Sequence, residues 1–272
     1  MAGVSGESLA AAQERLATML PSATLQLAEE LFGVLATLDS SAGLRRALTD
    51  PSRPGKDKEA LAKQLFGGKV SADAETVIAG LSSSRWARAR DIGDALETLA
   101  ATVAIAVAER GRSGGLSGLE RLENDLFAFN EVVNSSHELQ RSLVAPQASA
   151  DAKAALALKL VPNAGEPARV LIRQAAADPR GLKPTALVGR FVELVAERQE
   201  RWIAYVTVTA PLSPAQMERL QSGLDRLYDR ELKINESVDP RLVGGVRVKV
   251  GDEVLDASVI SRLGELRRQL AG

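Results

Sequence analysis

Apolar residues recur at intervals of three and four along most of the first 200 positions. Two clear runs are Leu27, Leu31, Val34, Leu35 and Leu38, and Leu119, Leu122, Leu126, Phe129 and Val133. This spacing places side chains on one face of an α-helix. The sequence therefore predicts amphipathic helices that pack by their apolar faces into bundles with short connections.

The helical region contains an internal repeat with an offset of 95 positions, because residues 27–100 align with residues 122–195 without a gap. The clearest matches pair Ser40, Ser41, Leu44, Arg46, Leu48 and Pro51 with Ser135, Ser136, Leu139, Arg141, Leu143 and Pro146. Serines are suited to the start of a short helix, and the prolines help to end it. We interpret the repeat as a duplicated helical domain, since its period is far longer than that of a solenoid.

The sequence of each copy of the repeat predicts the same series of helices. After the short helix comes another over residues 58–66 or 153–161, and each copy ends with a long helix. In the first copy this last helix is expected from about Arg85 to Arg110, and in the second from about Thr185 to Ile203.

The pattern changes near residue 204. The last 69 residues contain only five of the 43 alanines, and valine becomes the main apolar residue. Five of the eight residues 203–210 are β-branched and Pro211 follows them, which predicts a strand that ends at the proline. The run 213–216, Ser-Pro-Ala-Gln, is typical of a capped helix start. Further strands are expected over residues 233–238 and 246–250, with a hairpin turn at 251–252 and a last helix that begins after Ser258.

These patterns predict a mainly α protein with a small α+β C-terminal domain. Two related helical bundles are expected over residues 1–110 and 116–203, and the mixed strand and helix domain over residues 204–272. The high content of alanine and leucine, together with 3 % aromatic residues, favours helices over a β-sandwich.

The amino-acid composition limits the kinds of functional site that the chain can form. The chain has no cysteine, one histidine (His137) and a net charge of −1. Metal sites built on Cys and His spacing are excluded, a catalytic triad has one candidate imidazole, and no overall charge attracts nucleic acid or an anionic membrane. The first 20 residues do not have the pattern of a signal peptide, and the longest apolar run, residues 100–108, is too short to span a bilayer. We expect a cytoplasmic protein that is at most peripheral to a membrane.

Three local patterns have ordinary explanations. The glycine-rich run 111–115 lacks the Lys-Ser/Thr of a phosphate-binding loop, so we interpret it as a turn. Asp252, Glu253 and Asp256 form an acidic cluster, but turn and cap chemistry explains it better than a metal ion does. Three arginines lie near Trp86 in residues 85–90, where a solvated helix face or a contact with a protein partner is a simpler interpretation than a nucleic-acid contact.

Residues 238–259 carry a resemblance to a known family. The run contains the ordered positions of a long signature, namely Val238, Asp239, Pro240, Leu242, Gly244, Gly245, Gly251, Asp252, Asp256 and Ser258. It resembles the C-terminal signature of the delta subunit (oligomycin-sensitivity-conferring protein) family of F-type ATP synthases. The duplicated bundle is similar to the enlarged form of that family found in some bacterial lineages.

The resemblance implies a non-catalytic subunit of the peripheral stalk, without a cofactor, that joins the catalytic head to the membrane-anchored stalk during proton-driven ATP synthesis. An N-terminal bundle is expected to receive the N-terminal segments of the alpha subunits, and the C-terminal domain the C-terminal helix of stalk subunit b. We assign a contribution to the stalk contact to Leu263, Leu266 and Leu270. The protein would then lie at the cytoplasmic face of the cell membrane and contact the membrane only through the complex.

Another class of function stays open on the sequence. A helical regulator could bind nucleic acid through the Arg85–Arg90 face and the helix at Arg267 and Arg268, and it would show salt-dependent affinity for DNA. An enzyme is disfavoured, because we find no catalytic pair in the sequence.

Overall fold

The computed structural model describes residues 3–111, 114–229, 232–239, 242, 245–251 and 253–256. The chain divides into two compact units, residues 1–194 and 195–272. Helices of the first unit are α1 (Gly3–Ala17), α2 (Leu25–Ser40), α3 (Ala42–Thr49), α4 (Gly55–Phe66), α5 (Ala72–Ser83), α6 (Asp91–Glu109), α7 (Gly115–Asn134), α8 (His137–Val144), α9 (Ala150–Leu160) and α10 (Glu166–Ala177). Helix α11 (Pro184–Glu200) crosses the boundary between the units. The division into three domains at the expected residues stays a prediction.

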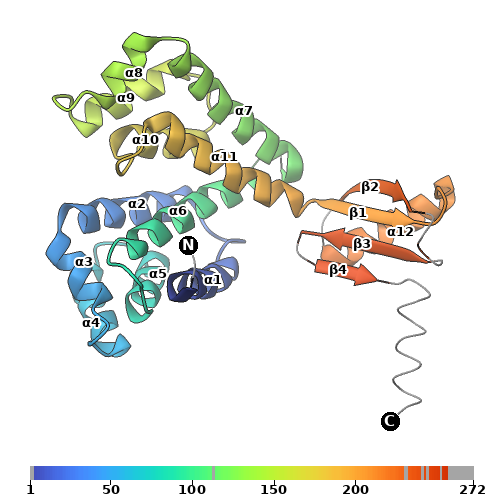
Figure 1. Ribbon diagram of the computed structural model, residues 1–272, viewed down its shortest axis with the longest axis horizontal. Helices are drawn as coiled ribbons and strands as arrows, with labels where there is room; N and C mark the ends of the chain where they lie inside the picture. The colour runs from blue at the N-terminus through green and yellow to red at the C-terminus, as the bar shows by residue number, and fades with distance from the viewer. Residues whose placement is uncertain are drawn as a thin grey trace. The chain divides into compact units, whose positions relative to one another are not determined.

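The predicted repeat is visible in the positions of the helices (Figure 1). Helices α3 and α8 have the same length and lie 95 positions apart at both ends. Their first turns are capped in the same way, because the side chain of Ser41 accepts a hydrogen bond from the Leu44 amide and that of Ser136 from the Leu139 amide. Both serines thereby satisfy an amide that the helix itself leaves without a partner.

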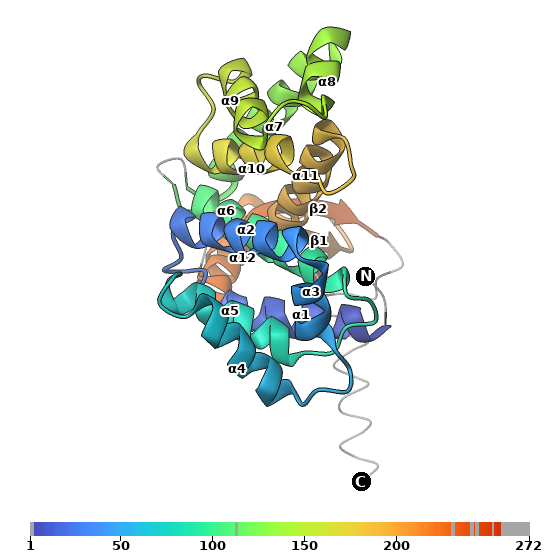
Figure 2. The ribbon, with the colours of Figure 1, turned by 90° about the vertical axis from the view of Figure 1, so that its left-hand side faces the viewer.

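Helix α6 belongs to both bundles. It packs against α1, α2 and α5 on one side and against α7 and α10 on the other, so that it lies between the two sets of helices in Figure 2. Fifteen of its 19 residues are buried, as expected for a helix that is apolar around its circumference. Adding the repeat offset of 95 to the bounds of α1 gives residues 98–112, which overlap the C-terminal half of α6. This half of α6 therefore serves as the first helix of the second bundle.

The predicted start of this helix at Arg85 is wrong, because α6 begins at Asp91. Trp86 is buried and its indole N–H donates to the carbonyl oxygen of Leu81 at 2.9 Å, which turns the preceding segment inward. The buried Asp91 carboxylate accepts hydrogen bonds from Ser5 Oγ and from the Arg88 amide. This loop is therefore held by contacts with α1 and α5 rather than by helical hydrogen bonds.

The described residues of the second unit form a small sheet and a helix that covers it. Its elements are β1 (Ile203–Val208), α12 (Pro214–Tyr228), β2 (Lys233–Val238), β3 (Val246–Val250) and β4 (Glu253–Asp256). The strand order is β2-β1-β3-β4; β1 and β2 are parallel, and the other pairs are antiparallel. The core holds alternate residues of β1 and β3, one face of α12, and the residue directly before β2; its members are Ala204, Val206, Val208, Leu224, Leu232, Val248 and Val250.

The fold class predicted from the sequence is confirmed. Both the strands and the capped helix start lie where the sequence places them, and both hydrogen bonds of the capping box between Ser213 and Gln216 are present. Among the described helices, none combines the length and the apolar character needed to cross a membrane.

Candidate functional site

The signature residues form the connections on both sides of β3. Val238 ends β2 opposite Val208, and the amide of the next residue, Asp239, donates to the Val208 carbonyl at 2.9 Å. The Leu242 amide donates to the Asp239 carbonyl at 3.1 Å, which makes a turn at this point. The described part of the signature therefore shapes the approach to β3.

Two glycines of the signature occupy left-handed backbone. Gly245 has φ of +85° directly before β3, and Gly251 has φ of +56° in the hairpin between β3 and β4. A side chain at these positions would be strained, which explains why glycine is required. Pro240, Gly244, Asp252 and Ser258 lie outside the described residues, as do the expected stalk contacts Leu263, Leu266 and Leu270 and the last helix that carries them. Asp256 ends β4, opposite Arg247.

The sheet face opposite α12 carries an exposed row of side chains. Tyr205 on β1 pairs with Lys249 on β3, which in turn pairs with Val254 on β4. Because successive residues of a strand point to opposite faces, these three lie on the side away from the core residues Val206 and Val248. Tyr205 is 41 % exposed and Val254 is 54 % exposed. Aromatic and aliphatic surface beside a lysine is suited to contact with another protein.

The first bundle has an open groove between α2, α3 and the end of α4. It encloses about 450 Å³ and is lined mainly by apolar side chains, with Glu30 and Lys69 among its polar residues; the apolar residues are Val34, Leu44, Leu65, Phe66 and Val70. Such a groove has the chemistry that receives the apolar face of an amphipathic helix.

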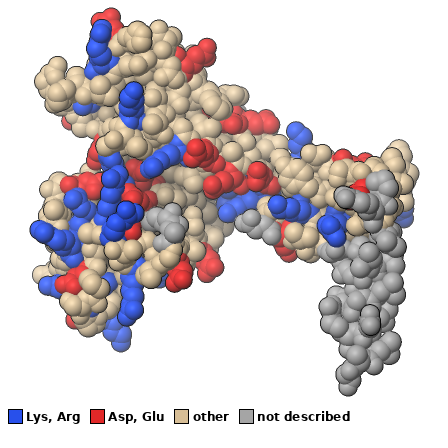
Figure 3. All heavy atoms as spheres, viewed as in Figure 1, with Lys and Arg blue, Asp and Glu red and all other residues tan. Residues whose placement is uncertain are grey.

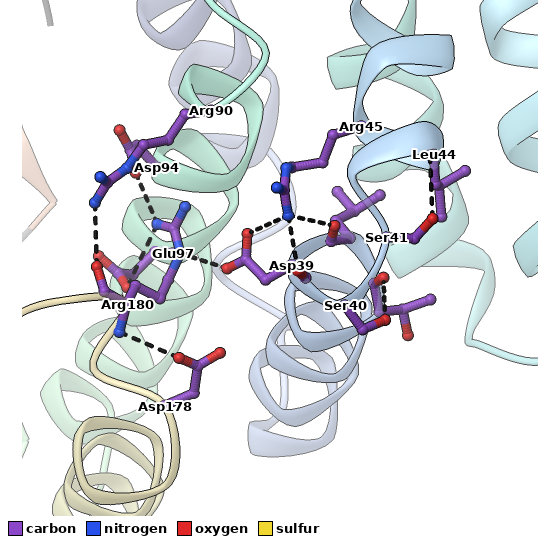
Figure 4. A network of polar contacts seen from close by, with 12 residues as sticks. Asp39, Ser40, Ser41, Leu44, Arg45, Arg90, Asp94, Glu97, Asp178 and Arg180 are labelled. Carbon is purple, nitrogen blue, oxygen red and sulfur yellow. Dashed lines mark hydrogen bonds and ion pairs between the residues drawn. The ribbon is translucent and has the colours of Figure 1, made fainter. Parts of the chain in front are cut away.

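A charged network joins the second bundle to the first (Figure 4). Arg180, in the loop between α10 and α11, reaches three carboxylates of the first bundle. Its Nε lies 2.6 Å from Asp39 Oδ2 on α2, and its Nη1 lies 2.7 Å from Asp94 Oδ1 and 3.7 Å from Glu97 Oε1 on α6. The guanidinium is planar and carries several donors in fixed directions, so it satisfies acceptors from two helices at once.

The loop is built to hold this arginine. Arg180 has φ of +52°, its amide donates to Asp178 Oδ1 at 3.1 Å, and Arg90 Nη2 donates to its carbonyl at 3.2 Å. Gly93 on α6 makes room for it, because a Cβ on that residue would lie 2.6 Å from Arg180 Nη2. Glycine at position 93 therefore permits the close approach of the guanidinium to α6.

Burial outweighs charge pairing at Glu97, whereas charge pairing outweighs burial at Arg180. The Arg180 side chain is only 6 % exposed and that of Glu97 only 9 %. Burial raises the pKa of the Glu97 carboxyl, and repulsion from Asp94 adds to this, while Arg180 and Arg190 partly oppose it. The pKa of Arg180 is raised despite its burial, because the hydrogen bond with Asp39 and the surrounding carboxylates favour the charged form.

The arginines around Trp86 do not form a base-stacking surface. The indole is buried, Arg88 pairs with Asp91, and Arg90 pairs with Asp94. On the face shown in Figure 3, basic and acidic side chains are interspersed over the helical unit. The interleaving of an aromatic ring with arginines seen in the sequence is therefore not present on the surface.

His137, the glycine-rich run 111–115 and the acidic cluster at 252–256 are the other candidate sites in the sequence. His137 is exposed at the start of α8, and Gly114 and Gly115, with φ of +37° and +53°, lead into α7. Among the described residues, no cluster of three or more His, Cys, Asp or Glu side chains is arranged to hold a metal ion. Asp252 of the acidic cluster lies outside those residues.

Sequence reasoning missed Arg180. Its only sequence signal is the repeat itself, because Arg180 lies 95 positions after Arg85, yet Arg85 is exposed while the Arg180 side chain is buried. The acids that it contacts come from distant parts of the chain, so no local motif marks them.

An open helical groove, a charge network between the repeats, and a sheet face that exposes Tyr205, Lys249 and Val254 define a protein-binding scaffold. A family model, ATP synthase delta (OSCP) subunit, matches residues 101–270. Similar curated proteins named ATP synthase subunit delta come from Pseudarthrobacter chlorophenolicus and Arthrobacter sp. (strain FB24), each 67 % identical, and from Renibacterium salmoninarum, 62 % identical; each alignment covers 100 % of both chains.

The chain belongs to the ATP synthase delta (OSCP) subunit family. Its function is that of a non-catalytic subunit of the peripheral stalk of F-type ATP synthase, which links the catalytic head to the membrane-anchored stalk. The resemblance seen in residues 238–259 is thereby confirmed.

Proposed function

We propose that the helical unit binds the N-terminal segments of the alpha subunits and that the second unit binds the C-terminal helix of stalk subunit b. The complex would then hold this chain at the cytoplasmic face of the cell membrane. The observation that carries the proposal is the open apolar groove between α2, α3 and α4, which has the shape and lining that accept an amphipathic helix.

The proposal for subunit b is supported by the exposed row Tyr205, Lys249 and Val254. Leu263, Leu266 and Leu270 are assigned to the same contact from the sequence alone. A stator contact must resist torque, so we expect a large apolar interface rather than a few surface ion pairs.

One truncated variant distinguishes the contact with the alpha subunits from the contact with subunit b. A chain that ends at Ser258 keeps the described core of the second unit, and we expect it to lose binding to purified subunit b while it keeps binding to the alpha subunits. Binding is measured by pull-down with each purified subunit, and circular dichroism checks that the truncated chain is folded. Full affinity of the truncated chain for subunit b would refute the assignment of the C-terminal residues.

A matched variant tests the groove. We expect Leu65→Glu to reduce binding of an alpha-subunit N-terminal peptide, because a charge would enter an apolar lining. Arg53→Glu, on the exposed turn before α4, serves as the control and should bind the peptide as the unchanged chain does. Equal binding by both variants would move the alpha contact away from this groove.

A further inference from the structure

Where the two bundles pack together, the carboxylates of the first bundle receive an arginine of the second, but the equivalent place in the second bundle receives no described side chain of the first. We call Asp39, Asp94 and Glu97 the acidic corner of the first bundle, which receives Arg180 from the second bundle. The offset of 95 maps these residues onto Asn134, Gly189 and Val192 of the second bundle. No described residue of the first bundle lines the cavity found beside Asn134, so the arrangement of the two repeats is open rather than reciprocal.

We call this second place the open corner. It encloses about 350 Å³ and is formed by the end of α7, by α8 and by the start of α11; its lining includes Val133, Asn134, His137, Arg141, Val144 and Lys183. Val144 is 50 % exposed, so apolar surface lies uncovered there. A partner would bury this surface.

The charge of the open corner is opposite to that of the acidic corner. Asn134, the repeat equivalent of Asp39, lines the cavity in place of a carboxylate, whereas Gly189 and Val192 are not part of its lining. Among the described residues, the lining carries Arg141 and Lys183 and no acidic side chain. Within the described part of the chain, neither of these two cations has an ion-pair partner. A second copy of this chain would present the loop of Arg85, the repeat equivalent of Arg180, and cations would then face cations.

We propose that the open corner docks an acidic segment of another ATP synthase subunit. The segment places carboxylates against Arg141 and Lys183 and an apolar side chain against Val133 and Val144. This inference rests on the proposed function, because it takes the partner from the same complex. It concerns a surface separate from the groove between α2, α3 and α4.

The first test uses a photo-crosslinking amino acid in the full chain, assembled into ATP synthase that has been depleted of its own copy of this subunit. Benzoylphenylalanine replaces His137, and in the control it replaces Ala42, the repeat equivalent on α3. We expect the probe at position 137 to cross-link to an acidic segment of another subunit, identified by mass spectrometry. A cross-link to the Arg85 loop of a second copy, or to a basic segment, would overturn the proposal.

The second test measures affinity for the same depleted complex. We expect Arg141→Glu to weaken binding about tenfold, because it reverses a charge inside the interface. Arg46→Glu, the same change at the repeat equivalent in the first bundle, should alter binding less than about twofold. Thermal unfolding of both variants verifies that they fold.

The outcomes separate the two proposals. If the unchanged chain does not enter the depleted complex, the proposed function fails and this inference fails with it. If it enters, while position 137 gives no intermolecular cross-link and Arg141→Glu binds as Arg46→Glu does, this inference alone is overturned.

Discussion

Arg180 Nε lies 2.6 Å from Asp39 Oδ2, although 141 positions separate the two residues in the sequence. The same guanidinium contacts Asp94 on α6, so one side chain joins the second bundle to two helices of the first. Asp39 also accepts from Arg45 Nη1 at 3.3 Å, which ties the end of α2 to α3. The interface between the repeats thus contains a buried cation whose partners all belong to the other bundle.

Arg180→Ala is expected to destabilise the helical unit by about 2–4 kcal/mol, because it leaves partly buried carboxylates without their cation. Arg180→Lys should recover only part of this loss, since an ammonium group lacks the planar set of donors. Urea unfolding followed by circular dichroism measures both. The control is Arg173→Ala, which breaks the exposed pair with Glu29 between the same bundles and should cost less than about 1 kcal/mol. Equal losses for the two alanine variants would contradict a special role for Arg180.

Glu97→Gln is expected to stabilise the protein at pH 7 and to have little effect below about pH 4. Because burial raises the pKa of Glu97, the folded chain keeps this proton to a higher pH than the unfolded chain. The free energy of unfolding therefore falls as the pH rises through the window between the two pKa values, and the cost remains above it. Gln removes this cost. Melting temperatures between pH 4 and pH 8 measure the difference.

Asp50→Asn provides a control of opposite sign for the pH experiment. Hydrogen bonds from Ser52 lower the pKa of the Asp50 carboxyl, so its contribution to stability is present above its ordinary pKa and is lost as the pH falls through the folded value. We expect Asp50→Asn to lower the melting temperature at pH 7 and not at acidic pH. The same pH profile for both variants would contradict the electrostatic explanation.

Gly118→Ala is expected to destabilise the protein by about 1–3 kcal/mol. A Cβ on Gly118 of α7 would meet the Ala108 carbonyl oxygen at the end of α6 well inside van der Waals contact. Gly33→Ala in α2 is the matched control, because nothing lies within 4 Å of its added Cβ. It should stabilise α2 by up to about 1 kcal/mol, the difference in helix propensity. Chemical unfolding of the two variants measures the change in the free energy of unfolding, which should be a decrease for Gly118→Ala and an increase for Gly33→Ala. A decrease for both variants would argue against the close approach of α6 and α7.

Ser41→Ala and Ser136→Ala should each cost about 1 kcal/mol, because each removes the acceptor for one amide at the start of a short helix. The two sites lie in different bundles and share no partner, so the double variant should show the sum. Differential scanning calorimetry of the three variants tests this. A clear effect at one serine alone would mean that the repeats no longer use the same cap.

Local patterns predicted the elements well where a local cause fixes them. The Ser213 box starts α12, and the alternation of Val246, Val248 and Val250 gives β3. The prediction failed at Arg85, because Trp86 is buried and its indole N–H donates to the Leu81 carbonyl. The Asp91 carboxylate at the true start of the helix accepts from Ser5, which lies 86 positions away in the sequence. Helix α1 was not predicted at all, although Ala12 and Leu16 have the spacing of a buried face.

The residues of the candidate site likewise divide into those that the sequence could predict and those that it could not. Gly245 and Gly251 could be singled out from the signature, and their positive φ angles give the reason. Arg180 could not, since a buried arginine is recognisable only when the helices that supply Asp39 and Asp94 have been placed. Its repeat equivalent Arg85 is exposed and lacks the left-handed backbone conformation that Arg180 adopts with φ of +52°.

Helix α6 sets the angular register of the two bundles. Because its N-terminal half is packed in the first bundle and its C-terminal half stands in for the first helix of the second, no linker separates them. Inserting one residue in the middle of α6 would rotate one bundle relative to the other by about 100° and move it about 1.5 Å along the helix axis. A change in the length of α6 would therefore also displace Arg180 of the second bundle from Asp94 and Glu97 on this helix.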